Sequence, residues 1–264
     1  MVIRALSLLP EACLGVAGSI VFAALVAAGS RAGRVAHRAA LTGAALAVVS
    51  AILTLRADDQ WLFAAYRVDL VSQIAKATIG GGILMTALLG RRAGDPFSGA
   101  RAVGPFFRLV AALALCVAAS AADLLALWLA VETATAALLV VLAAEGRWSS
   151  VEKLVRRLVA GVLPSALLIG LGVVVMAGVA GSTRYEDLLG SLAIQYARPT
   201  FLVAATLAVW SLVARLVFVT VQLRAGQAAG QAVHGVPEIS LVAGVMAAVL
   251  RLMALVGGIP LPHG

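Results

Sequence analysis

The chain has 264 residues, of which 62% are hydrophobic and 12% are charged. A water-soluble domain of this length needs a more polar exterior than so few charged residues can supply. The composition therefore excludes a soluble globular protein and predicts an all-α integral membrane protein. The formal net charge of +8 arises from short basic clusters between apolar stretches. That placement indicates topology signals and contacts with lipid headgroups, and no nucleic-acid partner is expected.

Apolar stretches long enough to cross a bilayer, which takes about 20 residues, recur along the whole chain. The tightest break between them, at 120–123, predicts a hairpin between two antiparallel helices. We expect one bundle of about eight transmembrane helices. The expected spans are 6–29, 36–55, 68–90, 105–121, 123–144, 154–180, 199–222 and 238–258.

Basic residues near the ends of these spans are distributed unequally between the two sides of the membrane. Twelve lie in or beside the loops that follow the first, third, fifth and seventh spans, and five lie on the opposite side. Cytoplasmic loops carry the excess of Lys and Arg in membrane proteins. The asymmetry predicts that both termini face the outer, periplasmic side.

Charged residues inside the expected spans are the first candidates for function, because such a charge costs about 3 kcal/mol or more unless it is paired or hydrated. Glu132 and Arg251 lie near the middle of their spans, whereas Arg215 and Lys76 lie nearer the ends of theirs. A buried carboxylate flanked by cations on neighbouring helices is the arrangement of a proton path. We therefore interpret Glu132 and Arg251 as functional. For Arg215 and Lys76, structural pairing or snorkelling toward the headgroups is an equal alternative.

Other polar residues near the spans are interpreted as structural. Glu11 and Asp69 each open a span, where a negative charge favours a helix N-terminus. Glu152 and Arg156 have the spacing of a solvated pair on one helix face. Pro164 lies inside the sixth span and is expected to kink it.

The sequence lacks the patterns of a cofactor or metal site. Cys13 and Cys116 lie in apolar stretches, where they are expected to pack as small hydrophobic side chains. His234 and His263 have no partner at metal-ligand spacing, and we interpret both as surface residues. There is no Gly-rich phosphate loop, no cysteine cluster and no Ser/His/Asp set. We expect no catalytic residue, cofactor or metal on this chain.

Four stretches carry a resemblance to a known family: LLPEACL, the long stretch from SAADLLALWLAVE to STRYEDL, VARLVFVTVQ, and HGVPEISLVAGVMAAVLRLMAL. The first resembles the opening of subunit N of bacterial respiratory complex I (NADH:quinone oxidoreductase). The others resemble the fifth to eighth helices of that subunit. The resemblance implies an N-terminal three-helix segment at 1–104 and one antiporter-type repeat of five helices at 105–264. It also implies a shortened form without the second repeat that the family carries.

The resemblance also implies a function. Antiporter-like subunits are shared by complex I, related membrane hydrogenases and Mrp-type cation/proton antiporters. A membrane-arm subunit in a bacterial inner membrane is expected, one that contributes to or scaffolds proton translocation beside other membrane subunits. NADH, FMN, iron–sulfur clusters and quinone would then belong to partner subunits. The alternatives are an Mrp-type cation/proton antiporter subunit and a structural subunit that has lost transport.

Matched residue by residue, the resemblance assigns Glu132 to the glutamate of the fifth helix. It assigns Arg156, Arg215 and Arg251 to lysines of the sixth, seventh and eighth helices. A buried lysine can lose its proton, whereas arginine, with a pKa above about 12, effectively does not. These arginines are therefore expected to act as fixed charges that tune Glu132, and Lys76 completes the set of proton-path candidates. The family's Pro-Phe-His break appears here as Thr-Val-Gln at 220–222, which predicts an unbroken seventh helix.

Overall fold

The computed structural model describes residues 7–27, 32–55, 60–62, 65–90, 103–144, 156, 158–190 and 198–227. Within these ranges the protein is an all-α membrane protein, as the composition predicts. Six described helices are long and apolar enough to cross a bilayer, and a seventh has a shorter apolar stretch, Pro199–Arg215. The described helices are α2 (Leu9–Ala27), α3 (Ala32–Leu53), α4 (Leu70–Gly90), α5 (Val103–Ser120), α6 (Leu124–Ala144), α8 (Leu163–Ala180), α9 (Tyr185–Gly190) and α11 (Pro199–Gln227).

Seven of the eight expected spans coincide with described helices. The eighth, at 238–258, lies outside the described residues. The predicted hairpin is confirmed, since α5 ends at Ser120 and α6 begins at Leu124. The prediction of an unbroken seventh helix is also confirmed, because α11 runs as one α-helix through 220–222.

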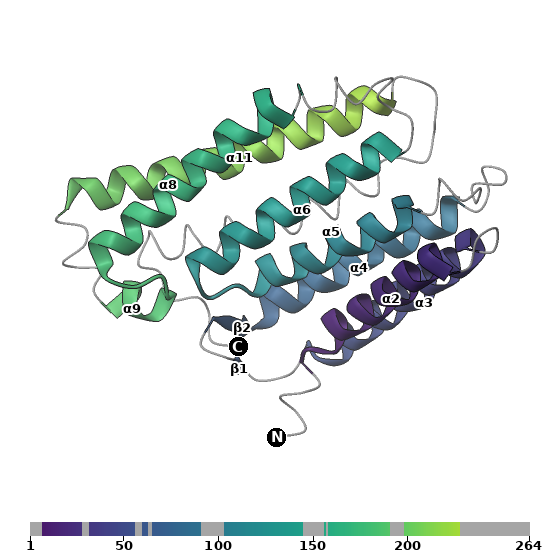
Figure 1. The fold of residues 1–264 in the computed structure, drawn as a ribbon. Helices are drawn as coiled ribbons and strands as arrows, with labels where there is room; N and C mark the ends of the chain where they lie inside the picture. Colours follow the sequence, from purple (N-terminus) through teal and green to yellow (C-terminus); the bar gives the residue numbers. More distant parts are fainter. Residues whose placement is uncertain are drawn as a thin grey trace.

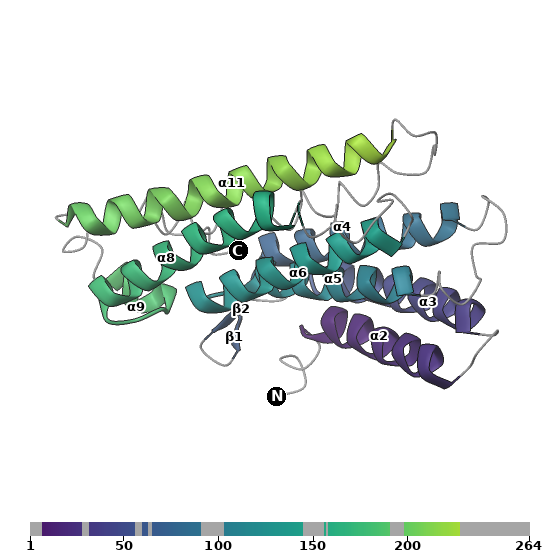
Figure 2. The ribbon, with the colours of Figure 1, turned by 45° about the horizontal axis from the view of Figure 1, so that its top comes forward.

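The long helices lie side by side, each roughly antiparallel to the one before it in the chain (Figures 1 and 2). α5 packs against α2, α4 and α6, whereas α8 packs mainly against α11. The division at residue 104 stays a prediction, because α5 joins the first three helices to the rest of the bundle. The core consists largely of alanine and aliphatic side chains. Small residues let helix backbones approach closely in membranes; at Gly43 on α3, a Cβ atom would overlap Ala17 on α2.

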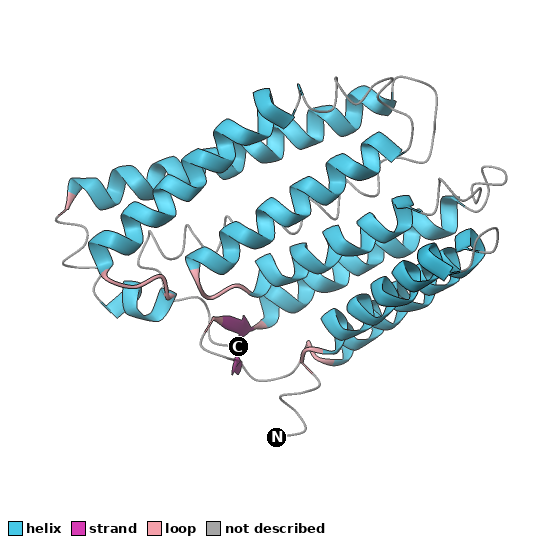
Figure 3. Cartoon of the chain, viewed as in Figure 1, coloured by secondary structure: helices cyan, strands magenta, loops and turns pink. Residues whose placement is uncertain are grey.

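A short antiparallel β-hairpin, β1 (Gln60–Leu62) and β2 (Tyr66–Val68), lies at one end of the bundle (Figure 3). The sequence analysis placed only a loop here, because three-residue strands are too short to show a strand periodicity. The hairpin is joined to the α5–α6 turn by a bridge between Tyr66 and Ala121 and by a hydrogen bond from Ala122 N to Ala65 O of 2.8 Å. It therefore covers the end of the bundle at which α2, α4 and α6 begin.

Carboxylates cap two of the helices that begin at this end. The backbone N–H of Ser72 donates to Asp69 Oδ1 at 2.8 Å, which confirms the expected role of Asp69 at the start of α4. Asp123 accepts from the N–H of Leu125 at 2.8 Å and thereby caps α6. Its other oxygen accepts from the Thr183 hydroxyl at 2.5 Å, which ties the α5–α6 turn to the turn after α8.

The sixth span begins with a π-helix, η3 (Leu158–Val162), which leads directly into α8. The sequence analysis expected a kink at Pro164. The structure instead places Pro164 in the first turn of α8, and the irregularity lies in the preceding turn. Proline has no N–H to donate to that turn, so the regular α-helical bonding cannot continue through it. π-helical turns of this kind are frequent at functional sites.

Candidate functional site

Glu132 on α6 and Arg215 on α11 form an ion pair inside the bundle. Arg215 Nη1 lies 2.5 Å from Glu132 Oε1. The Arg215 side chain is 2% exposed and that of Glu132 is 24% exposed. Of the two alternatives for Arg215, the structure shows pairing and not snorkelling. A charge at this depth needs a partner of opposite sign, and each residue supplies that partner to the other.

Three hydrogen bonds fix the rest of the Arg215 guanidinium to the start of α8. Nε donates to Ser165 Oγ at 3.1 Å, and Nη2 donates to the same oxygen at 3.0 Å. Nη2 also donates to the backbone carbonyl of Val162, the last residue of η3, at 2.9 Å. The planar guanidinium holds its donors in fixed directions. Arg215 therefore joins α6, η3, α8 and α11 through one side chain.

The sequence around η3 is suited to this close approach. Gly161 faces the ring of Phe218 on α11, and a Cβ atom at this position would overlap that ring. Ser165 directly follows Pro164, and its hydroxyl donates to the Val162 carbonyl at 2.9 Å. The junction of η3 and α8 thus presents the Val162 carbonyl and the Ser165 hydroxyl oxygen side by side, and both accept hydrogen bonds from Arg215.

The surroundings of the ion pair are apolar. Trp128, one turn before Glu132 on α6, packs against Gly170 on α8. A small apolar cavity between α6, α8 and α11 is lined by Leu124, Leu127, Trp128, Ile169, Val173, Met176, Ala208 and Leu212. Such an environment excludes water and strengthens electrostatic attraction. Glu132 is therefore a carboxylate held by a permanent positive charge in an apolar setting.

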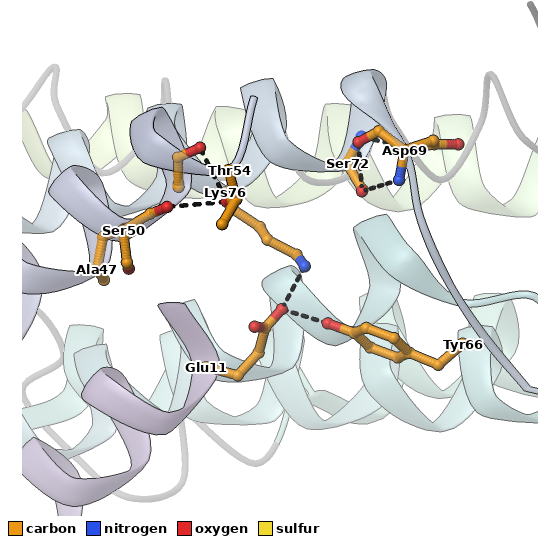
Figure 4. A network of polar contacts seen from close by, with 9 residues as sticks. Glu11, Ala47, Ser50, Thr54, Tyr66, Asp69, Ser72 and Lys76 are labelled. Atoms are coloured by element: carbon orange, nitrogen blue, oxygen red, sulfur yellow. Dashed lines mark hydrogen bonds and ion pairs between the residues drawn. The ribbon is translucent and has the colours of Figure 1, made fainter. Parts of the chain in front are cut away.

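Lys76 does not join this pair but forms a second buried centre near the hairpin end of the bundle (Figure 4). Its Nζ lies 2.7 Å from Oε1 of Glu11 on α2, and the Lys76 side chain is fully buried. The hydroxyl of Tyr66 on β2 donates to the same Glu11 oxygen. Lys76 Nζ also lies 5.1 Å from the centroid of the Tyr66 ring, in the geometry of a cation–π contact. For Lys76 too, pairing and not snorkelling is found.

The interpretation of Glu11 as a helix cap is therefore incomplete. Glu11 does lie in the first turn of α2, but its carboxylate contacts Lys76 and Tyr66 from two other elements. Burial raises the pKa of the Tyr66 phenol, and the nearby Glu11 carboxylate raises it further. Tyr66 therefore keeps its proton and remains a hydrogen-bond donor.

Of the remaining candidates for the proton path, the structure describes only Arg156. Arg156 is exposed. Arg251, Glu152, His234 and His263 lie outside the described residues. Within the ranges that the structure describes, no three metal-ligating side chains come together, and both cysteines are free thiols.

Sequence reasoning missed three residues that the structure brings to these centres: Ser165, Glu11 and Tyr66. Ser165 gave no signal, because serine is common near proline in membrane helices. Glu11 and Lys76 are 65 positions apart, so no spacing rule relates them. Tyr66 lies between the second and third expected spans, where the sequence predicts a loop. Only the packing of α2, α4 and the hairpin brings Glu11, Lys76 and Tyr66 together.

No protein-family model and no curated protein matches the sequence. Among solved structures, the chain is similar to a chain of a respiratory complex I from Thermus thermophilus, determined with bound aureothin, with a TM-score of 0.66 and 23% identity. The similarity covers 92% of this chain and 52% of that chain. At this level of identity the comparison establishes a shared fold, and this chain spans about half the length of its structural neighbour.

Proposed function

We propose that the protein is a membrane-arm subunit of a complex I-like NADH:quinone oxidoreductase, in which it contributes to proton translocation. In this proposal NADH, FMN, iron–sulfur clusters and quinone are bound by partner subunits, and this chain carries none of the redox chemistry. It lies in a bacterial inner membrane with its termini on the periplasmic side. Its antiporter-like character follows from the resemblance of its middle helices to subunit N.

One observation carries the proposal: an ion pair between the partly buried Glu132 and the buried Arg215 lies inside a fold shared with a chain of respiratory complex I. Structural ion pairs are common in soluble proteins. A carboxylate near the middle of a transmembrane helix is rare and usually marks an ion or proton pathway. Here the pair also lies beside a π-helical turn, which adds an adaptable backbone element to the site.

In the proposed mechanism Glu132 is the group that gains and loses the proton. Arg215 remains charged throughout, since arginine does not deprotonate at accessible pH. The positive charge draws a carboxylate into the apolar interior, and any movement of α11 relative to α6 changes the strength of that attraction. Such a change alters the proton affinity of Glu132 without requiring Arg215 to carry the proton.

A structural subunit that has lost transport is the second candidate. The observation in its favour is that all three nitrogens of the Arg215 guanidinium are engaged, by Glu132, Ser165 and Val162. A side chain held this firmly joins helices whether or not a proton ever reaches Glu132. This candidate predicts assembly without a contribution to pumping.

Isolation of the assembly from native membranes tests the proposal. A tagged chain, extracted in mild detergent, should bring with it hydrophilic dehydrogenase subunits and NADH:quinone oxidoreductase activity. The matched control is an unrelated tagged polytopic membrane protein from the same membranes, which should bring neither. Recovery with other membrane subunits that exchange cations for protons, and without any dehydrogenase, would favour an Mrp-type antiporter subunit and overturn the proposal.

A further inference from the structure

We propose that Lys76, Glu11 and Tyr66 form a second proton-exchange site, which is separate from the Glu132–Arg215 pair and lies at the hairpin end of the bundle. Lys76 is the seventh residue of α4, so it lies about 9 Å along the helix from Leu70 at 1.5 Å per residue. Glu11 is in the first turn of α2. The cluster is therefore buried yet close to one end of the transmembrane region.

The chemistry of this cluster differs from that of the Glu132 pair in one respect. Arg215 cannot release a proton under ordinary conditions, whereas a buried lysine can. The Lys76–Glu11 pair therefore has two forms of equal net charge. In one, an ammonium faces a carboxylate; in the other, an N–H bond of Lys76 has broken and an O–H bond has formed on Glu11 Oε1. The 2.7 Å separation of Nζ and Oε1 permits this transfer without movement of the helices.

Tyr66 and the second carboxylate oxygen provide the remaining parts of the site. Tyr66 donates to Oε1 together with Lys76, so Oε1 is engaged on two sides. Glu11 Oε2 is buried and has no hydrogen-bond partner in the described part of the chain. It has the lone pairs to accept a proton or a water molecule. Exchange with solvent then takes two steps. The proton held by the Glu11 carboxyl group leaves to water, which leaves a neutral Lys76 amine beside a Glu11 carboxylate, and the amine then takes up a proton from water.

Gln73 supplies an independent observation. It lies three residues before Lys76 on the same face of α4 and is 1% exposed. Both its amide nitrogen and its amide oxygen are buried, without a hydrogen-bond partner among the described residues. Buried polar atoms are almost always satisfied by protein or by ordered water. An amide that can donate and accept at once, one turn from Lys76, suits a water-mediated link to the cluster.

The charged and titratable groups around the cluster come from four elements. α2 contributes Glu11, α4 contributes Lys76, and β2 contributes Tyr66 and Arg67, with Asp69 between β2 and α4. α5 contributes Cys116, which is fully buried beside Glu11 and Lys76. Arg67 and Asp69 form their own ion pair, with Nε and Oδ2 3.9 Å apart. α3 presents the hydroxyls of Ser50 and Thr54 on this side of α4, and both donate to backbone carbonyls of their own helix (Figure 4). Glu11 and Lys76 are therefore each other's closest charged partners.

Infrared difference spectroscopy of the protein in its native assembly, recorded as the pH is changed, tests the proposal. We expect a carboxyl band that appears and disappears with pH in the wild type and is lost in Glu11→Gln. The matched control is Glu132→Gln, which removes a different buried carboxyl and should leave this band in place. Lys76→Arg keeps the positive charge but cannot pass on a proton, and we expect it to lose the band as well.

Tyr66→Phe provides a variant that changes no charge. It removes one donor from Glu11, so the band should persist at a shifted frequency. If Lys76→Arg does not accumulate in the membrane, Glu11→Gln and Tyr66→Phe still decide the matter. A pH-difference spectrum that Glu11→Gln leaves identical to the wild type would show that the cluster is a static ion pair, and would overturn the proposal. This outcome is independent of whether the protein belongs to a complex I-like assembly.

Discussion

Arg215 shows how one side chain sets both the structure and the chemistry of the candidate site. Its guanidinium contacts a carboxylate on α6, a hydroxyl on α8 and a backbone carbonyl at the end of η3. A lysine has three donors on one atom and cannot meet partners spread along a plane in the same way. Arginine at position 215 therefore holds a fixed geometry around Glu132, but it cannot release a proton.

Removal of the cation should destabilise the bundle because it leaves a carboxylate unpaired at membrane depth. We expect Arg215→Met to reduce the stability of the assembled protein by about 3 to 5 kcal/mol, the cost of breaking a buried pair from one side. The double variant Arg215→Met/Glu132→Gln removes both charges and should recover much of that loss. Thermal denaturation in detergent measures both. Equal losses of stability in the single and the double variant would mean that the charges of Glu132 and Arg215 do not stabilise each other, which would contradict the described ion pair.

Ser165 is expected to contribute to the stability of the protein only through its hydrogen bonds with Arg215. Its Oγ accepts from Nε and Nη2, so Ser165→Ala removes the acceptor for two charged donors and should cost about 1.5 to 3 kcal/mol. The matched control is Thr133→Ala on α6, whose hydroxyl is exposed and donates only to the carbonyl of Leu129 in its own helix. The same thermal denaturation should show little change for that control. Indistinguishable losses at both positions would contradict the role given to Ser165.

At the scale of elements, the α8–α11 interface depends on close backbone approach. Gly172 faces α11, and a Cβ atom there would lie 2.8 Å from the Ala204 carbonyl oxygen. We expect Gly172→Ala to force the two helices apart and to cost about 1 to 3 kcal/mol. Gly178 is on the same helix with nothing within 4 Å of the added atom. Gly178→Ala should be neutral or stabilising by up to about 1 kcal/mol. If Gly178→Ala lowered the stability more than Gly172→Ala does, the described packing would be contradicted.

The helices could be predicted from the sequence because the bilayer demands about 20 apolar residues for each span. The turn at 120–123 and the cap at Asp69 were also predictable, since both depend on local residue types. The π-helix and the β-hairpin were not. η3 depends on how Pro164, Gly161 and the Phe218 ring pack together, and the hairpin depends on its bridge to the α5–α6 turn.

The candidate site was predictable only in part, for a related reason. A charge inside an apolar span is visible in the sequence, so Glu132, Arg215 and Lys76 were identified by their depth alone. Which cation pairs with which carboxylate depends on helix packing. In the sequence Lys76 and Arg215 have the same alternatives, whereas in the structure Lys76 pairs with Glu11 and Arg215 pairs with Glu132.

At the scale of the whole molecule, the distribution of basic residues predicts the orientation in the membrane. α9 lies at the hairpin end of the bundle, whereas α2 ends and α3 begins at the other end (Figure 1). Glu186 on α9 and Arg34 on α3 are both exposed. In a background with Cys13 and Cys116 replaced by alanine, a membrane-impermeant thiol reagent added outside should label Glu186→Cys and not Arg34→Cys. Labelling of Arg34→Cys and not of Glu186→Cys would contradict the predicted topology.

The two ion pairs described at the candidate centres differ in chemical character and lie on different helices. Glu132 on α6 is paired with an arginine on α11, and Glu11 on α2 is paired with a lysine on α4. The turn after α5 contacts two elements at the hairpin end of the bundle, since Ala121 bridges to Tyr66 on β2 and Asp123 accepts from Thr183 after α8. This turn therefore joins the end of α8 to the strand that carries Tyr66.

The proposal that Glu132 is a working proton site is tested most directly by the variant Glu132→Gln. Two quantities are measured in native membranes: the yield of the assembly and the number of protons translocated per electron. Glutamine keeps the shape and hydrogen bonding of the side chain but cannot titrate. We predict that the assembly accumulates at nearly the wild-type level while proton translocation per electron falls. Unchanged translocation in a fully assembled complex would contradict the account. A selective loss of assembly, with normal translocation by the part that does assemble, would leave Glu132 as a purely structural partner of Arg215.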